Sequence, residues 1–409
     1  MADLANDERT ETEIPSFPLV QKCPFRHTPE YARLRAEEPV SKVKLEVSGR
    51  EAWVIATHDL VKQVLTSPAM SSNWRNPGYP HQVALSEEIL NTLDLPLLAL
   101  DPPEHTVRRR LLIPEFTVKR VNALRPRIQE FVDACIDRML AKGGPVDLVQ
   151  ELAVPVPTLL FAELMGAPAE DATSFREHAE GTMTRGVDFD ELDRLQMEME
   201  KHLAALVTEK EQHPTDDLLS RIIAKNKEDG ALEHHDLVAI ARMLMYGGFD
   251  TAANMISLGT VTLLQHPDQL DQLKADPSLA QKAIGELLRY LSINDSASAR
   301  VATEDTRLGD VTVREGEGVI LLYGSANRDE AVFENADVFD IHRDTRGHVA
   351  FGGGVHQCPG ASLVKVELEI VFNTLFRRIP ELRLAVPFEE LPFKNDTLMY
   401  GMYECPVTW

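Results

Sequence analysis

The sequence predicts one large, mainly α-helical domain with a minor β part. Apolar residues make up 44% and charged residues 26% of the 409 residues, which is the ordinary balance of a globular chain. Apolar side chains recur at helical spacing through most of the chain, whereas residues 297–322 carry β-branched pairs separated by Gly and Asp. Because no internal repeat and no linker-like stretch divides the chain, we expect a single domain over residues 1–409.

The first β-rich stretch is expected at 40–56. Short strands at 40–47 and 52–56 lie on either side of a Ser-Gly turn. Residues 70–100 follow, with three prolines and no clear periodicity. A long irregular stretch in a compact protein is often a functional loop, so this segment is a candidate for ligand binding.

Helices are expected in most of the remaining chain. At 281–291, four apolar residues recur at the i, i+3, i+4, i+7 spacing of one helix face. The helix expected at 120–140 places Cys135 on its apolar face, which predicts a core residue. Further helical patterns cover 155–166, 188–212 and 236–266, and a helix is expected to open at Pro359.

The charge balance limits the possible partners. Acidic residues number 65 and basic residues 42, giving a net charge of −23. A surface this negative repels nucleic acid and anionic membranes, so neither is expected as a partner. The N-terminal residues are polar and acidic, without the apolar segment of a secretory signal. Residues 243–267 are apolar, but Asp250 among them opposes membrane insertion by about 2.5–3.5 kcal/mol.

The cysteines favour a reducing compartment. All four are far apart and no CxxC pair occurs, so neither a zinc knuckle nor a redox dithiol is predicted. We therefore expect reduced thiols in a cytoplasmic protein. The four residues are Cys23, Cys135, Cys358 and Cys405.

The strongest chemical motif is FGGGVHQCPG at residues 351–360. Pro359 suits the first turn of a helix, which places Cys358 at the helix N-terminus, where the dipole and free amides favour a thiolate. The glycines allow the backbone to pass close to a flat ligand.

This motif resembles the haem-binding signature of the cytochrome P-450 family of haem-thiolate monooxygenases. The residues that carry the resemblance are Phe351, Gly354, His356, Cys358 and Gly360. Glu286-Leu-Leu-Arg289 is similar to the family's helix motif, and Arg343 stands where the family places an arginine that joins this structural pair. Residues 247–251 (GGFDT) resemble the family's oxygen-activating stretch, and 101–105 (DPPEH) a haem-contacting helix.

The resemblance implies the fold of that family, with a long central helix over a haem. Since CxxCH is absent, we expect a non-covalently held haem b, with Cys358 as the metal ligand on its proximal side. Its two carboxylates need cations or donors when buried, and His105 and Arg109 share one helix face. The expected cofactor-binding residues are His105, Arg109, Gly247, Arg300, Phe351, Gly352, His356, Cys358 and Gly360.

Two residues of the central helix are the expected catalytic pair. A threonine in a helix can bond the carbonyl four residues back, here from Thr251 to Gly247. Two adjacent glycines leave this turn free to bulge and to open a groove. Asp250 lies beside the groove and can supply the protons that oxygen activation needs.

The resemblance implies a monooxygenase acting on an apolar small molecule such as a macrolide, terpenoid, sterol-like or statin-like compound. YGMYECPVTW at the C-terminus resembles the bacterial subfamily that modifies secondary metabolites and foreign compounds. Besides the central helix, the pocket is expected to draw on 70–100, 175–195, 292–298 and the turn near 398–399. The named lining residues are Leu98, Met243, Gly247, Ile293, Ala297 and Met399.

The electron source implied is NAD(P)H, through a ferredoxin reductase and a ferredoxin. A basic cluster stands out in this acidic chain and comprises Arg108, Arg109, Arg110, Lys119 and Arg120. Arg109 points inward if His105 does, and the remaining arginines could dock an acidic ferredoxin. We expect a monomer.

Two alternatives stay open. The first is a nitric oxide reductase of the same fold that uses NADH directly, because ANMISLG at 253–259 and SANRDE at 325–330 resemble that fungal branch. Asp250 and Thr251 argue against it, as that branch does not keep the acidic residue. The second alternative is a non-catalytic haem sensor or carrier, which the same two residues disfavour.

Overall fold

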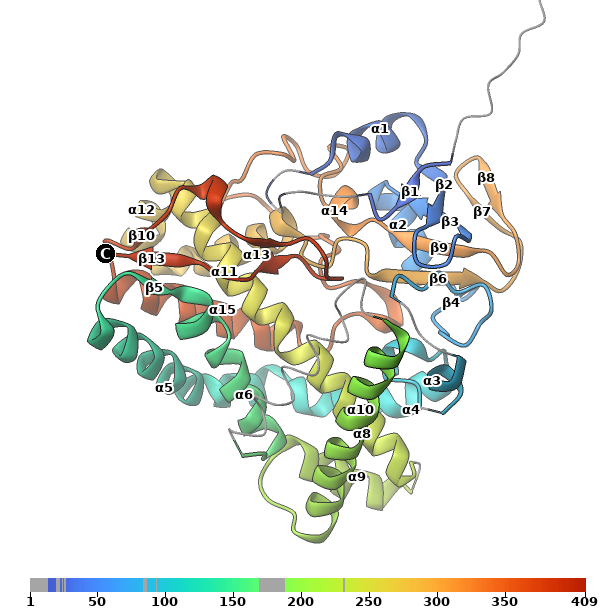
Figure 1. Cartoon of the computed structure of the whole chain (residues 1–409), viewed down its shortest axis with the longest axis horizontal. Helices are drawn as coiled ribbons and strands as arrows, with labels where there is room; N and C mark the ends of the chain where they lie inside the picture. Colours follow the sequence, from blue (N-terminus) through green and yellow to red (C-terminus); the bar gives the residue numbers. More distant parts are fainter. Residues whose placement is uncertain are drawn as a thin grey trace, which may run out of the picture.

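A group of helices and a smaller β-rich part lie side by side in the computed structural model, with the main sheet at the right in Figure 1. The structure describes residues 14–19, 23, 25, 27–83, 87–92, 94–168, 188–230 and 232–409. The predicted mainly α fold with a minor β part is confirmed. That all 409 residues form one domain stays a prediction.

The helices of the described residues follow the apolar periodicity closely. The helices expected at 120–140, 155–166, 188–212 and 281–291 are present with similar bounds. The helices are α1 (Pro29–Glu37), α2 (His58–Thr66), α3 (Glu87–Thr92), α4 (Glu104–Leu112), α5 (Val118–Lys142), α6 (Pro155–Met165), α8 (Phe189–Gln212), α9 (Leu218–Asp229), α10 (His234–Gly248), α11 (Asp250–Gln265), α12 (Pro267–Ala275), α13 (Ala280–Leu291), α14 (Tyr323–Ala326) and α15 (Ala361–Arg378).

The largest apolar core forms where α5, α6, α11, α13 and α15 pack together. Cys135 is fully buried in this core, as its place in the helical pattern predicts. Gly259 allows α11 to approach α15 closely, because a Cβ there would lie 2.7 Å from the ring of Phe372. A second core joins α8, α9 and α10 at the bottom of Figure 1.

The central segment is interrupted at one residue. The pattern at 236–266 predicts one long helix, but α10 ends at Gly248, α11 begins at Asp250, and Phe249 lies between them. Glycine is a poor helix former, and the Thr251 hydroxyl donates to the Gly247 carbonyl at 2.9 Å, which competes with the helix ladder. No described atom would lie within 4 Å of a Cβ on Gly247, so the helix surface is open there.

The main sheet joins segments from both halves of the chain. Its order is β1-β2-β3-β9-β6-β4. β2 and β3 form the hairpin predicted at 40–56, and β9 pairs with β3 in parallel, so the two β-rich stretches of the sequence meet in one sheet. The strands of this sheet are β1 (Ser16–Phe17), β2 (Val40–Leu45), β3 (Glu51–Ile55), β4 (Met70–Ser71), β6 (Ser298–Ala302) and β9 (Gly318–Leu321).

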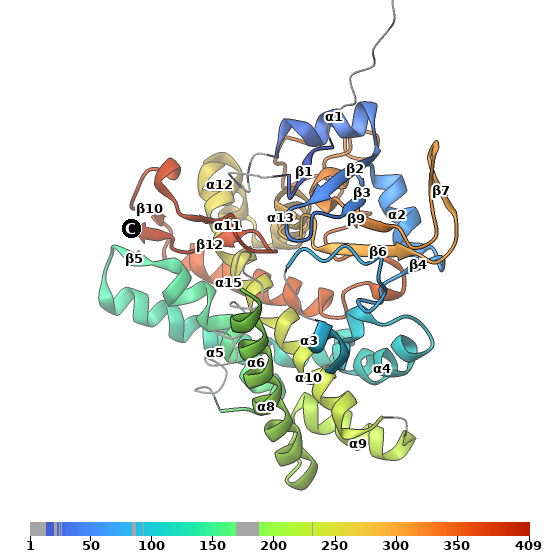
Figure 2. The same cartoon turned by 45° about the vertical axis from the view of Figure 1, so that its right-hand side comes forward.

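The remaining strands are short. β7 (Thr306–Leu308) pairs with β8 (Val311–Val313), and β10 (Arg383–Leu384) with β13 (Pro406–Thr408), which also pairs with β5 (Val146–Asp147). A last hairpin joins β11 (Phe393–Lys394) and β12 (Gly401–Met402). After rotation by 45°, Figure 2 shows β12 beside α11. A Cβ on Gly401 would overlap the Asn254 side chain, so the hairpin lies directly against α11.

Candidate active site

The cysteine loop is closed by its own backbone. The Cys358 N–H donates to the Phe351 carbonyl at 2.9 Å, which brings the two ends of the motif together. Gly354 has a φ of +62°, and a Cβ there would overlap the Leu65 carbonyl, so only glycine fits. α15 begins at Ala361 rather than at Pro359, so the prediction that this proline opens the helix is wrong by two residues.

Cys358 is exposed as a residue, and protein groups surround its thiol. Burial by these groups raises the pKa of the thiol, while the N–H groups of Gly360 and Ala361 and the positive charge of Arg109 lower it. Burial is the largest cause and the net shift is upward. A metal ion bound to the sulfur would add a positive charge that favours the thiolate further.

A cluster of basic and aromatic side chains lies beside this loop. The rings of His105 (α4) and His356 lie 4.3 Å apart, and His356 Nε2 is 3.0 Å from Ser72 Oγ. Arg109 donates to the Gln357 carbonyl at 2.6 Å, and the buried Arg300 of β6 donates to the Ala299 carbonyl at 2.7 Å. α4 and β6 thus bring together residues that are about 200 positions apart.

This cluster suits a ligand with carboxylate groups. Both ring nitrogens of His105 are buried and have no hydrogen-bond partner among the described residues. Burial and the charge of Arg109 lower the pKa of His105 to about 4. Burial and the charge of Arg300 lower that of His356 to about 3. Neutral imidazoles beside two guanidiniums form a basic site whose unused donors match anionic oxygens.

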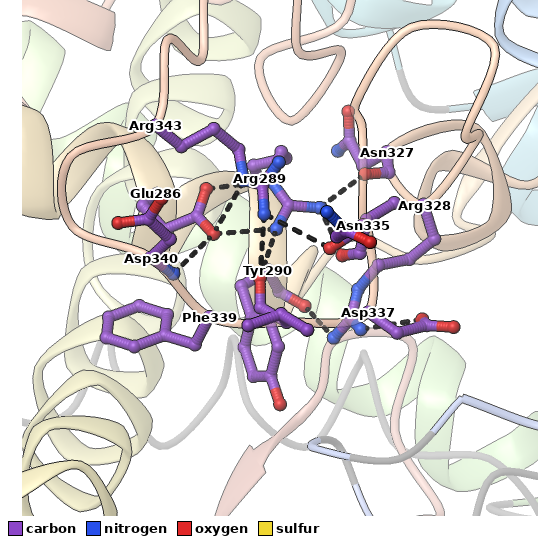
Figure 3. Close-up of polar contacts among 12 residues, drawn as sticks. Glu286, Arg289, Tyr290, Asn327, Arg328, Asn335, Asp337, Phe339, Asp340 and Arg343 are labelled. Atoms are coloured by element: carbon purple, nitrogen blue, oxygen red, sulfur yellow. Dashed lines mark hydrogen bonds and ion pairs between the residues drawn. The ribbon is translucent and has the colours of Figure 1, made fainter.

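A buried ion-pair cluster fixes the coil that precedes the cysteine loop (Figure 3). Arg289 donates to both carboxylate oxygens of Glu286, at 2.7 and 2.8 Å, and both side chains are fully buried. Arg343 lies 3.2 Å from the same carboxylate and also donates to the carbonyls of Asn335 and Val338, at 3.1 and 3.0 Å. The three residues named by the sequence motif therefore meet, and they tie α13 to the coil over 335–343.

On the central segment, the carboxylate of Asp250 is held from two sides. The Asn254 amide, one turn later on α11, donates to it at 2.9 Å. Lys394 Nζ lies 3.3 Å from its other oxygen, and both side chains of this pair are largely buried. Lys394 pairs with Gly401 in the hairpin that packs on α11, which explains how it reaches Asp250. No sequence motif pointed to Lys394.

A small cavity borders Asp250 between α6, α10, α11 and the β11–β12 hairpin. Polar side chains in its lining come from α6, α11 and the hairpin. Apolar side chains are added by other elements, among them α10. Its lining comprises Val149, Gln150, Val154, Thr158, Met245, Tyr246, Phe249, Asp250, Ala253, Asn254, Ser257, Lys394, Met402 and Tyr403. Thr251 is not among these residues, so the two expected catalytic side chains diverge from the central segment.

A second and larger cavity contains three of the six expected substrate-pocket residues: Leu98, Ala297 and Met399. Met243, Gly247 and Ile293 do not line it; Met243 and Ile293 are buried in the cores instead. The remaining lining residues are Trp74, Tyr79, Pro80, His81, Gln82, Val83, Leu90, Asp94, Leu95, Pro96, Gln196, Arg242, Tyr246, Ala299 and Leu398.

The orientation of α10 explains why Met243 and Gly247 do not line the larger cavity. Arg242 and Tyr246, one turn apart, face the cavity, and Met243 and Gly247 lie about 100° further round the helix. Arg242 is buried and pairs with Glu200 of α8 and with the Asp94 carbonyl. The irregular stretch 70–100 supplies most of the wall, as expected. Of the expected segment 175–195, residues 175–187 lie outside the described residues.

The basic cluster predicted as a docking surface is smaller than expected. Arg108 is buried and ion-paired with Asp236, because its position on α4 faces the second core. Arg109 turns toward the cysteine loop, as expected from its place on the helix face of His105. Arg110 and Arg120 are exposed, at 3.7 and 3.5 Å from Asp229 and Glu115. Lys119 is also exposed.

The comparisons with known proteins identify the family of this chain. The family model described as Cytochrome P450 matches residues 182–384. Vitamin D3 dihydroxylase from Streptomyces griseolus is 40% identical over 100% of this chain and 100% of that protein. Pentalenic acid synthase from Streptomyces avermitilis is 42% identical over 96% of this chain and 97% of that protein.

Solved structures indicate the same family. The crystal structure of cytochrome P450 MoxA from Nonomuraea recticatena, a CYP105 protein, has a TM-score of 0.88 and 45% identity, over 96% of this chain and 98% of that one. The chain belongs to the cytochrome P450 family. It is a cytochrome P450 monooxygenase, related to bacterial CYP105 enzymes. The cofactor of this family is a haem with a thiolate ligand, and its members commonly receive electrons from partners such as ferredoxin.

Among the described residues, none of the helices combines the length and hydropathy needed to cross a bilayer.

Proposed function

We propose that this enzyme inserts one oxygen atom into an apolar small molecule of the macrolide, terpenoid, sterol-like or statin-like class. Electrons come from NAD(P)H through a ferredoxin reductase and a ferredoxin. The observation that carries the proposal is the combination of the Cys358 loop with the basic cluster of His105, Arg109, Arg300 and His356.

The described residues fit a non-covalent haem b. Cys358 would ligate the iron, and the Gly360 and Ala361 amides would stabilise its sulfur. The carboxylates of the haem would be bound by His105, Arg109, Arg300 and His356. Both ring nitrogens of His105 are buried and have no partner among the described residues, so they are available for this contact. Phe351 and Gly352 would complete the loop that holds the cofactor. When bound, the haem supplies the oxygen-activating chemistry.

The chain's own residues would supply and control protons. Thr251 keeps its hydroxyl at the open turn by donating to the Gly247 carbonyl at 2.9 Å. Asp250 would carry protons from the cavity that borders it, while Lys394 and Asn254 fix the position of its carboxylate.

The larger cavity supports an apolar substrate. Leu98, Ala297, Leu398 and Met399 supply aliphatic surface, and Trp74 adds an aromatic wall. The names of two relatives, vitamin D3 dihydroxylase and pentalenic acid synthase, support the same class. The exposed Arg110, Lys119 and Arg120, in a chain of net charge −23, would form the docking surface for an acidic ferredoxin.

The proposal is tested by optical titration of the ferric protein with polyketides, terpenoids, sterols and statins, followed by turnover with NAD(P)H, ferredoxin reductase and ferredoxin. We expect a high-spin shift with one class and a product heavier by one oxygen atom. Turnover of nitric oxide with NADH alone, without ferredoxin, would contradict the proposal and favour the reductase alternative.

A further inference from the structure

Asp295 lies buried behind the wall of the larger cavity, where four separate segments of the chain meet. It lies three residues before the start of β6, and its carboxylate accepts hydrogen bonds from the hydroxyls of Tyr31 (α1) and Tyr400. Its backbone carbonyl accepts the N–H groups of Tyr323 and Gly324 in α14, at 2.6 and 3.4 Å. A carboxylate at this depth is stable only when such donors surround it.

Two of these segments form parts of the cavity wall. Ala297 and Ala299, two and four residues after Asp295, line the cavity, and Leu398 and Met399 line it directly before Tyr400. The segments are joined by the Tyr400 N–H, which donates to the Ile293 carbonyl at 2.9 Å. The Tyr400 hydroxyl adds a second link, at 3.3 Å from the Asp295 carboxylate.

The other side of Asp295 has no room to move. A Cβ on Gly324 would overlap the Asp295 carboxylate and would lie 2.7 Å from the ring of His27. The Tyr31 hydroxyl donates to the same carboxylate oxygen as Tyr400, and the Tyr31 ring packs edge-on against His27 at 5.9 Å. Asp295 is therefore fixed against α1 and α14, and Tyr400 is fixed against Asp295.

We propose that Asp295 and Tyr400 are positioning residues that set the distance between the 297–299 and 398–399 parts of the cavity wall. They thereby select the shape of the substrate without touching it. This inference rests on the proposed function, because it assigns the larger cavity to the substrate. Tight packing and directional hydrogen bonds make the wall rigid, and a rigid wall discriminates between ligands by shape.

The test uses two iron-binding probes, imidazole and 4-phenylimidazole, titrated optically against the haem-loaded protein. Imidazole occupies little beyond the iron, whereas 4-phenylimidazole also contacts the cavity wall. Tyr400→Phe keeps the ring and removes the hydroxyl that contacts Asp295. We expect the Kd of 4-phenylimidazole to change by about fivefold or more, and the Kd of imidazole to stay within about twofold.

Tyr290→Phe is the matched control, since Tyr290 packs on Arg328, away from the larger cavity. It should leave the ratio of the two Kd values unchanged. If Tyr400→Phe does not fold, Asp295→Asn tests the same link, because the amide keeps the shape of the side chain and loses its charge. A folded, haem-loaded variant whose Kd ratio equals that of the wild type would overturn the inference. A wild-type protein that binds neither haem nor imidazole would instead refute the proposed function.

Discussion

Lys394 Nζ lies 3.3 Å from Asp250 Oδ1, which links the last hairpin of the chain to the interruption of the central helix. Both side chains are largely buried, so neither charge can turn to solvent without a change in packing. Asn254 binds the second carboxylate oxygen at 2.9 Å. The position of the candidate proton carrier therefore depends on a residue 144 positions away.

Lys394→Met tests this link. The variant leaves the Asp250 carboxylate buried without its cation, so the free energy of unfolding should fall by about 3 kcal/mol. The yield of oxygenated product per NAD(P)H consumed should fall about tenfold, because the carboxylate is no longer held in place. Denaturant unfolding and product analysis measure these effects. Lys394→Arg should recover most of the product yield, and equal yields in Lys394→Met and the wild type would refute the assigned role.

Thr251→Ala should separate oxygen consumption from product formation. The variant loses the hydroxyl that donates to the Gly247 carbonyl, so proton delivery fails while electrons still arrive. We expect product yield to fall about tenfold or more, with a matching rise in released peroxide. Thr251→Ser should keep the coupling. An unchanged product yield in Thr251→Ala would refute the role assigned to this hydroxyl.

Arg343→Ala should abolish stable cofactor loading rather than alter substrate preference. Glu286 is fully buried, and removal of one cation leaves part of its charge uncompensated, at a cost of about 3–5 kcal/mol. The carbonyls of Asn335 and Val338 also lose a donor, so the coil before the cysteine loop should loosen. Haem content and thermal unfolding measure the effect. Arg346→Ala, at an exposed position nearby, should leave both unchanged.

The cofactor-free protein should lose stability as the pH falls from about 6.5 to about 4. Burial lowers the folded-state pKa of His105 to about 4 and that of His356 to about 3. Both values lie below the unfolded-state value of about 6.5, so in this window only the unfolded chain takes up the protons, and unfolding becomes more favourable.

Two bound carboxylates would raise both histidine pKa values, so the haem-loaded protein should lose less stability over the same pH range. Denaturant unfolding at about pH 7 and about pH 5, with and without haem, measures the difference. His356→Gln should weaken the pH dependence of the cofactor-free protein. Parallel pH dependences of the two forms would mean that the histidines do not face the carboxylates.

Much of the fold could be predicted from the sequence, because amphipathic helices carry their period locally. The helix at 280–291 is an example, since its buried face shows directly as apolar spacing. The interruption at Phe249 could be predicted only in part. Two glycines indicate a weak turn, but the hydroxyl bond from Thr251 that competes with the ladder depends on the folded backbone.

The candidate site residues also divide into those that the sequence could predict and those that depend on tertiary packing. The cysteine loop and the Glu286 motif are contiguous, so they could be named from sequence. Lys394 could not, because β11 is two residues long and only tertiary packing brings it to Asp250. The burial of Arg108 was not predicted, because the rotation of a helix about its axis is set by the whole core.

The central claim is that Cys358 ligates a haem held by the surrounding basic cluster. The most direct measurement is the absorption spectrum of the reduced, carbon monoxide-bound protein, compared with that of Cys358→His. We predict a red-shifted Soret band of the thiolate type in the wild type and a band of the imidazole type in Cys358→His. A wild-type protein that binds no haem, or that shows the same spectrum as Cys358→His, would contradict the account.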